Sequence, residues 1–380
     1  MPSSLVVSFD PPLPLNRAFV SERFIRIIND LNIVERYFDN KLVKELFDYY
    51  DKNSYKPLIK SLLTLAKLNK PAYASVTGVF LEMIYKYDQE SFKALQAASA
   101  TGNIKIIPSA FYGGLYPLCA NSGDEIGEQI KLVSDLITKY GLQKAQAAAM
   151  PFLIYNSEVE KGAKASGVEA VITEEVEGFT DHRFVYSNLG GEVKVISRNR
   201  KASEALANGD FDQAKPIDGV IYISAEEIAQ KGPKFAEVLG NYFYNSDLDL
   251  GPLPSSNSPA TGTIYVPQGQ CLQNLSYYDG KPVWSKQKAQ RMLMDKMCGL
   301  LTYVKWLGDQ KLLQIWRILM QGDIFLSLTE DQVKRVKIIT DPNEALIAYS
   351  YVLGDFEGKL ASLILKKKEK MSELEARQKI

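Results

Sequence analysis

Several residues that could do chemistry lie at the ends of apolar or aromatic runs that the sequence predicts as strands. Glu174 and Arg198 each come directly after such a run, and Asp247 comes shortly after another. Residues just after parallel strands face a shared cleft, so carboxylates there could act as a nucleophile or as a general acid. An arginine at such a position could contact a ligand or form a structural ion pair with a carboxylate.

The segment 147–175 predicts a strand, a sharp turn, a helix and a second strand. The turn contains Pro151, and the helix begins at Asn156 or Ser157, either of which is a good N-cap. A strand, a helix and a second strand in this order form a βαβ unit with parallel strands. The residue just after the first strand is Phe152. A phenyl ring carries no atom that can act as a nucleophile or transfer a proton.

The order Pro-Phe-Leu-Ile-Tyr-Asn at 151–156 resembles the nucleophile region of glycoside hydrolase family 57, the α-amylase and 4-α-glucanotransferase-like enzymes. The family pattern there is Pro-Glu-Leu-Ile-Tyr-Asn, followed by a helix and a strand that ends in Thr-Glu, which matches Thr173 and Glu174. The resemblance therefore implies that Phe152 stands at the position of the catalytic nucleophile.

The resemblance extends over most of residues 5–330, although the polar groups of the family's cleft are replaced. Ser-Val-Thr-Gly-Val at 75–79 matches one family strand end, and the segment 102–115 matches the backbone markers of the next. The three positions at which the family has histidine hold Phe9, Gly113 and Ile324. Lys105 stands at the position of a family glutamate. The residues that agree with later family motifs are Arg198, Asn199, Ser203, Trp316, Arg317, Leu319, Asp323 and Phe325.

The second catalytic carboxylate of the family should follow a strand that we expect at 241–245. The family pattern Asp-Tyr-Glu-Thr-Phe-Gly, anchored on Gly251, places Ser246 at the aspartate position. A shift of one residue places Asp247 there instead. Asp247 and Asp249 could also be solvated loop acids without a catalytic role.

The resemblance implies an α/β fold, an incomplete (β/α)7-type parallel barrel followed by a C-terminal α-helical bundle. We expect parallel strands near 4–9, 72–77, 104–108, 147–152, 168–173 and 193–197, one at 219–223, and helices after residue 284. The expected domains are a barrel over 1–250, an irregular excursion over 251–283, a helical domain over 284–358 and a charged C-terminal helix or tail over 359–380.

Composition limits the classes of partner. The chain has 380 residues, 46% of them apolar, and its 45 basic and 45 acidic side chains give a formal net charge of zero. No global field therefore favours nucleic acid or an anionic membrane. The apolar runs are shorter than the roughly 20 residues that span a bilayer, and the first residues lack the basic region of a signal peptide. We expect a cytoplasmic protein.

Cysteine and histidine are scarce. The three cysteines are widely spaced, without a Cys-x-x-Cys pair, and we interpret them as buried apolar residues. His182 is the only histidine, so the sequence excludes a multi-histidine metal centre. We expect neither a metal nor another cofactor.

The missing nucleophile and histidines predict a non-catalytic, family 57-like protein that serves as a binding or assembly protein. Its partner could be an α-glucan or a protein, and it could also form a homo-oligomer. The alternative is an active α-glucan hydrolase or glucanotransferase that uses displaced acids, namely Glu174, Glu175 or Asp247. Phe9 and Phe152 could plug the former sugar site, or form an aromatic platform with Tyr112 and Tyr155. The candidate cleft residues are Phe9, Asp10, Tyr112, Phe152, Tyr155, Arg198, Asp247, Trp316 and Asp323.

Overall fold

The computed structural model describes residues 3–16, 36–175, 185–187, 193–212, 219–245, 248–254, 259–268, 270–271, 284, 287–329 and 341–378. The chain divides into two compact units. The first comprises Met1–Pro11 and Lys44–Ser276, and the second comprises Pro12–Val43 and Tyr277–Ile380. Each unit is described by itself below.

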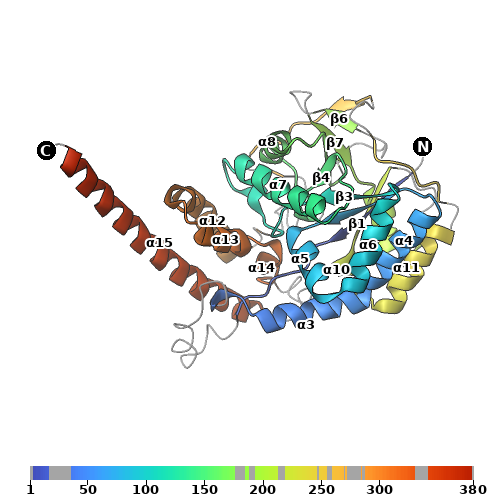
Figure 1. Cartoon of the computed structure of the whole chain (residues 1–380), viewed down its shortest axis with the longest axis horizontal. Helices are drawn as coiled ribbons and strands as arrows, with labels where there is room; N and C mark the ends of the chain where they lie inside the picture. The colour runs from blue at the N-terminus through green and yellow to red at the C-terminus, as the bar shows by residue number, and fades with distance from the viewer. Residues whose placement is uncertain are drawn as a thin grey trace. The chain divides into compact units, whose positions relative to one another are not determined.

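The first unit is built on two sheets of mainly parallel strands (Figure 1). One sheet has the order β3-β2-β1-β8, and all of its neighbours pair in parallel. Its strands are β1 (Ser4–Phe9), β2 (Ala72–Val76), β3 (Ile104–Pro108) and β8 (Val220–Ser224). The second sheet has the order β4-β5-β7-β6-β9. Its strands are β4 (Ala147–Ala149), β5 (Ala170–Thr173), β6 (Val185–Ser187), β7 (Lys194–Ser197) and β9 (Gly262–Thr263).

Parallel pairing continues through β4, β5 and β7, whereas β6 runs antiparallel to β7. Two isolated parallel bridges join the second sheet to the two edge strands of the first sheet, β3 and β8. One lies between Ile106 and Lys144 and the other between Arg198 and Val220. One buried apolar cluster draws side chains from β1, β2, β3, β4, β5, β7 and β8, so both sheets share a core. The parallel strands expected over 70–200 are confirmed.

Helices follow the strands of the first unit, and several begin with a polar cap directly after a strand. Thr77 accepts a hydrogen bond from the Phe80 amide at 3.2 Å, and Asn199 accepts one from the Ala202 amide at 2.9 Å. A cap at this position fixes the direction in which the chain leaves the sheet. The helices are α3 (Asn40–Tyr50), α4 (Lys56–Lys67), α5 (Gly78–Tyr87), α6 (Gln89–Ala100), α7 (Gly123–Lys139), α8 (Ser157–Ser166), α9 (Arg200–Asn208), α10 (Ala225–Ala229) and α11 (Pro233–Asn245).

The strand expected at 241–245 is wrong, because these residues form the end of α11. The buried positions of α11 are Ala236, Leu239, Gly240 and Phe243, a helical spacing that decides against a strand. Proline at the first helical position suits this start. Ser246 and Asp247 lie outside the described residues.

The described part of the second unit after residue 284 is mainly helical, as expected. Its helices are α12 (Lys288–Leu307), α13 (Gln310–Leu319), α14 (Gly322–Leu326) and α15 (Pro342–Gln378). Trp316 donates its indole hydrogen to the Met297 carbonyl at 2.8 Å, and Tyr349 donates to the Leu319 carbonyl at 2.9 Å. These bonds tie α13 to α12 and to α15. Among the described residues, no helix combines the length and the apolar character needed to cross a bilayer.

A short π-helix, η2 (Asp51–Tyr55), joins α3 to α4. Burial is the main cause that raises the pKa of the Asp51 carboxyl from 3.8 to about 7, and the nearby Asp88 carboxylate contributes to this increase. Asp48 also raises this pKa, and Lys56 opposes the increase. Asp51 therefore changes charge near neutral pH.

The Asp51 carboxyl should make the stability of the protein depend on pH. The folded protein holds this proton more tightly than the unfolded chain, so the free energy of unfolding should fall as the pH rises from about 4 to about 8. Asp51→Asn should lose this dependence. At pH 8 it should be more stable than the unmodified protein by about 1–2 kcal/mol, allowing for the solvent screening of a half-buried group. Denaturant unfolding at both pH values measures the effect.

Asp135→Asn, which changes an exposed carboxylate on α7, is the matched control and should keep the pH dependence. Equal slopes for Asp51→Asn and Asp135→Asn would contradict the assignment of the proton to Asp51.

Candidate functional site

The strand ends of the first unit bring together residues that are distant in the sequence. Because β5 pairs in parallel with β7, and Thr173 lies opposite Ser197, the next residues Glu174 and Arg198 emerge side by side. β1 pairs with β8 in the same way, with Ser8 opposite Ser224. Asp10 and the start of α10 therefore also lie close together. The carboxyl ends of parallel strands are where barrel enzymes place their reacting groups.

Phe152 lies in a tight turn after β4, at the position expected for the nucleophile. The turn is a single 3-10 helix, Pro151–Leu153, and both Phe152 (φ 56°) and Leu153 (φ 55°) adopt left-handed backbone angles. Such angles are uncommon for residues other than glycine and cluster at functional sites. The Thr173 hydroxyl donates to the Leu153 carbonyl at 3.2 Å and so fastens the turn to β5. The Phe152 side chain is half-buried.

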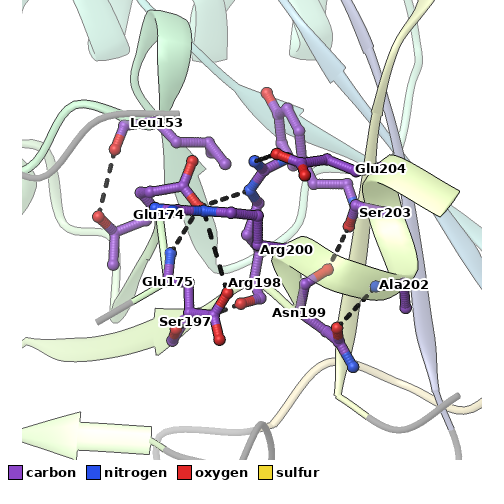
Figure 2. Close-up of polar contacts among 12 residues, drawn as sticks. Leu153, Glu174, Glu175, Ser197, Arg198, Asn199, Arg200, Ala202, Ser203 and Glu204 are labelled. Carbon is purple, nitrogen blue, oxygen red and sulfur yellow. Dashed lines mark hydrogen bonds and ion pairs between the residues drawn. The ribbon is translucent and has the colours of Figure 1, made fainter. Parts of the chain in front are cut away.

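Glu174 is the centre of a buried ion cluster at the ends of β5 and β7 (Figure 2). Its Oε1 accepts from Arg198 Nε at 2.7 Å, from Arg200 Nε at 3.1 Å and from the Glu175 amide at 2.8 Å. Glu174 is only 1% exposed. Arg198 also approaches Glu204, with 3.6 Å between Nη2 and Oε1.

This arrangement assigns a structural ion pair to Arg198, one of the two roles that the sequence left open. It also limits the chemistry of Glu174. Its Oε1 accepts from three donors, two of them guanidinium groups, so it would have to give up charge-assisted hydrogen bonds before it could attack a substrate. Its Oε2 is buried and accepts no hydrogen bond from the described residues.

Glu226 is a half-buried carboxylate at the strand ends that the sequence did not point to as a site residue. Its Oε1 accepts from the Asp10 amide at 2.7 Å and from the Tyr55 hydroxyl at 2.8 Å, and its Oε2 accepts from the Ser224 hydroxyl at 3.0 Å. Burial raises the pKa of Glu226. Because Glu226 follows a serine cap, its local sequence indicates only a helix start, and only the fold brings it to β1.

Asp10 lies against the loop that follows β3, and this contact explains why residue 113 is glycine. Gly113 has φ +64°, and a Cβ atom on it would lie 2.6 Å from Asp10 Oδ1. A side chain at residue 113 and the present position of the Asp10 carboxylate are therefore incompatible. The glycine at residue 113 and the carboxylate of residue 10 are therefore structurally coupled.

Phe9 does not belong to the group of side chains at the strand ends. It is fully buried, stacks on Phe80 with 4.7 Å between ring centroids, and meets the edge of Tyr55 at 5.6 Å. Phe80 lies on α5 and Tyr55 at the start of α4, so Phe9 packs between the sheet and the helices. A phenylalanine there supports the fold instead of filling a cleft.

The remaining candidates lie in the first unit, in the second unit or outside the described residues. Tyr112 is half-buried and packs against Phe111, with ring centroids 4.6 Å apart. Tyr155 is 1% exposed, and its hydroxyl lies 3.5 Å from Glu160 of α8. Trp316 and Asp323 belong to the second unit. Asp247 and His182 fall outside the described residues. Within the described part of the chain, no group of three or more histidine, cysteine or acidic side chains could hold a metal ion.

The Glu174 cluster should make a large contribution to stability. Glu174→Gln removes the carboxylate nearest to both guanidinium groups and leaves only the longer ion pairs with Glu204 and Glu175, so we expect the free energy of unfolding to fall by about 2–4 kcal/mol. Glu175→Gln, a change in the next and partly exposed carboxylate, should cost less than about 1 kcal/mol. Urea unfolding compares the two variants. Similar losses for both would contradict the central role of Glu174.

The contact between Asp10 and Gly113 should appear as a coupling energy. Gly113→Ala should destabilise the protein by about 2–3 kcal/mol, because the left-handed backbone and the overlap with Asp10 both oppose a Cβ atom. In an Asp10→Ala background the overlap disappears and about 1 kcal/mol should remain. Gly141 has φ +67° and open space around it, so Gly141→Ala is the control for the backbone effect alone. A cycle without coupling would refute the contact.

Comparisons with known proteins agree with this arrangement. The sequence profile of glycosyl hydrolase family 57 matches residues 11–229, more than half of the chain. A protein of Methanocaldococcus jannaschii described as "Putative alpha-amylase" is 28% identical over 193 residues, 49% of this chain and 41% of that relative. The chain therefore matches less than half of the relative's length.

Solved structures share the fold at low sequence identity. The family 57-type branching enzyme of Pyrococcus horikoshii superposes with a TM-score of 0.59 at 11% identity, over 94% of this chain and 95% of that one. The 4-α-glucanotransferase of Thermococcus litoralis has the same TM-score at 12% identity, over 85% of this chain and 55% of that one. At such identities the likeness establishes the fold alone. With the profile match over most of the first unit, it follows that this chain belongs to glycosyl hydrolase family 57.

Proposed function

We propose that this chain is a non-catalytic member of family 57 that serves as a binding or assembly protein. The observation that carries the proposal is the turn after β4, whose backbone is left-handed at Phe152, the residue that the family resemblance sets at the position of the nucleophilic carboxylate. Retaining hydrolysis requires a nucleophilic carboxylate and a general acid on either side of the scissile bond. A phenyl ring supplies neither function.

The state of Glu174 supports the same proposal. It follows β5, the strand that pairs with β4, and a displaced nucleophile would have to be free to attack a sugar carbon. Its Oε1 instead accepts from Arg198 and Arg200, and its burial leaves 1% of its surface exposed. Releasing it for covalent catalysis would strip two guanidinium groups of their partner, which is expensive in a buried site.

The organisation we propose follows from this membership. The two bridges would join the sheets into an incomplete (β/α)7-type barrel. The C-terminal helices, which follow the barrel in the sequence, would form a helical bundle. Its ligand would be an α-glucan or a protein partner, bound near Tyr112, Phe152 and Arg198. The α-glucan alternative rests on what the relatives are said to act on, namely α-glucans. We place the protein in the cytoplasm and propose no metal or other cofactor.

The purified full chain should not hydrolyse or transfer α-1,4-glucan faster than a variant that lacks two of the three alternative acids. That variant is Glu174→Gln/Asp247→Asn, assayed at a temperature at which both proteins are folded. The reason is that double displacement has lost its nucleophile, and with it several orders of magnitude in rate. Glucan cleavage that is present in the unmodified chain and absent from the double variant would overturn the proposal and assign catalysis to those acids.

Phe152→Glu is the complementary test. It places a carboxylate in the turn without supplying the second acid, so turnover should stay at background. The substitution should also lower the free energy of unfolding by about 1–3 kcal/mol, because a half-buried ring is replaced by a charge. Robust turnover in Phe152→Glu would show that the rest of the catalytic machinery is intact.

A further inference from the structure

A groove of about 500 Å³ lies on the outer surface of the first unit, between α4 and α11. Residues of the π-helix η2 line part of it, and α4 and α11 lie side by side (Figure 1). A Cβ atom on Gly240 would lie 2.0 Å from Ser61 Oγ, so the two helices nearly touch at this point. The volume is within the range of small-molecule sites, roughly 300–1,000 Å³. The lining residues are Asp51, Lys52, Lys56, Pro57, Lys60, Ser61, Thr64, Pro233, Glu237, Asn241 and Tyr244.

Three of these residues are lysines at four-residue intervals, Lys52, Lys56 and Lys60. Like charges at this spacing repel and destabilise a helix by roughly 0.2–0.5 kcal/mol per pair. Lys56 is compensated by Glu90, at 2.6 Å from its Nζ. The side chains of Lys52 and Lys60 form no ion pair or hydrogen bond with the described residues, so two uncompensated ammonium groups line the groove.

The opposite wall adds a neutral donor. The Tyr244 hydroxyl donates to the Asn241 side-chain oxygen. This bond fixes the amide so that its oxygen is occupied and its NH₂ group is left to donate. The hydroxyls of Ser61 and Thr64 already donate to carbonyls of their own helix, at 2.9 Å and 3.0 Å. The groove therefore offers more donors than acceptors.

The carboxyl groups of the groove do not cancel this charge at neutral pH. Burial raises the pKa of Asp51 to about 7, so much of it is uncharged there. Its Oδ1 is buried and has no hydrogen-bond partner among the described residues. Glu237, which is exposed, is the other acid of the lining. The two positive charges of Lys52 and Lys60 therefore exceed the negative charge that Glu237 and the partly ionised Asp51 supply at neutral pH.

We propose that the groove between α4 and α11 binds a small phosphate-type oxyanion through Lys52, Lys60 and the Asn241 amide. Lysine acts as a point charge toward phosphate, and an ordered amide adds direction. The site includes none of the strand-end residues described above. It is therefore independent of the proposed loss of glycosidase activity.

Inorganic pyrophosphate is the probe, titrated into the full chain by calorimetry, with thermal unfolding as a second measurement. We expect saturable binding that weakens at least about tenfold in Lys52→Gln/Lys60→Gln. Lys93→Gln/Lys131→Gln removes the same charge from exposed positions on α6 and α7 and should bind as the unmodified chain does. Pyrophosphate should raise the unfolding temperature of the control variant and of the unmodified chain, but not of Lys52→Gln/Lys60→Gln.

Two outcomes would overturn the proposal. One is the absence of saturable binding up to about 10 mM pyrophosphate. The other is equal weakening in both double variants, which would mean that pyrophosphate responds only to the net charge of the protein. Because all four lysines are exposed or half-exposed at the surface, the variants should fold, and their unfolding temperatures without ligand verify this.

Discussion

The pairing of β1 with a strand on each side is the constraint on which the first unit depends. β1 joins β2 on one side and β8 on the other, and the hydrogen bond from the Asp10 amide to Glu226 that closes this contact spans 216 residues. Contacts so distant in sequence must overcome a large loop-closure entropy, so they form only when the intervening βα units are in place. Glu226 contributes by accepting donors from β1, from Tyr55 and from its own cap, which fixes the strand ends relative to the helices.

The same geometry that gathers polar groups at the strand ends also neutralises them. Glu174 meets Arg198 and Arg200, and both oxygens of Glu226 accept hydrogen bonds from neighbouring groups. Acid–base catalysis needs groups whose proton affinities are matched to the reaction and whose lone pairs are available to the substrate. A carboxylate whose partners are supplied by the fold contributes rigidity instead. The ion cluster and the contact between Asp10 and Gly113 therefore hold the strand ends in place.

Local patterns in the sequence predicted most elements of the fold, but they could not predict which residues distant in the sequence contact each other. The strands from β1 to β5, the cap Asn156 and the helix after it are local features, and they are confirmed. Residues 241–245 have the aromatic content of a strand, but the burial of Leu239 and Phe243 on one helical face outweighs it. Glu226 was missed because a serine cap explains its local sequence fully. Phe9 was placed in the cleft because it aligns with a family histidine, although the alternation along β1 sends its ring to the helices.

The turn at Phe152 separates geometry from chemistry within this site. Left-handed angles at two consecutive residues, Phe152 and Leu153, are costly, of order 1–2 kcal/mol each, and persist only when surrounding contacts hold them. Here the Thr173 hydroxyl and the Met150 carbonyl hold Leu153, and neither bond involves the side chain of residue 152. The conformation is therefore a property of the β4–β5 junction and does not depend on a carboxylate. The order of segments around the turn can therefore agree with family 57 although residue 152 is phenylalanine.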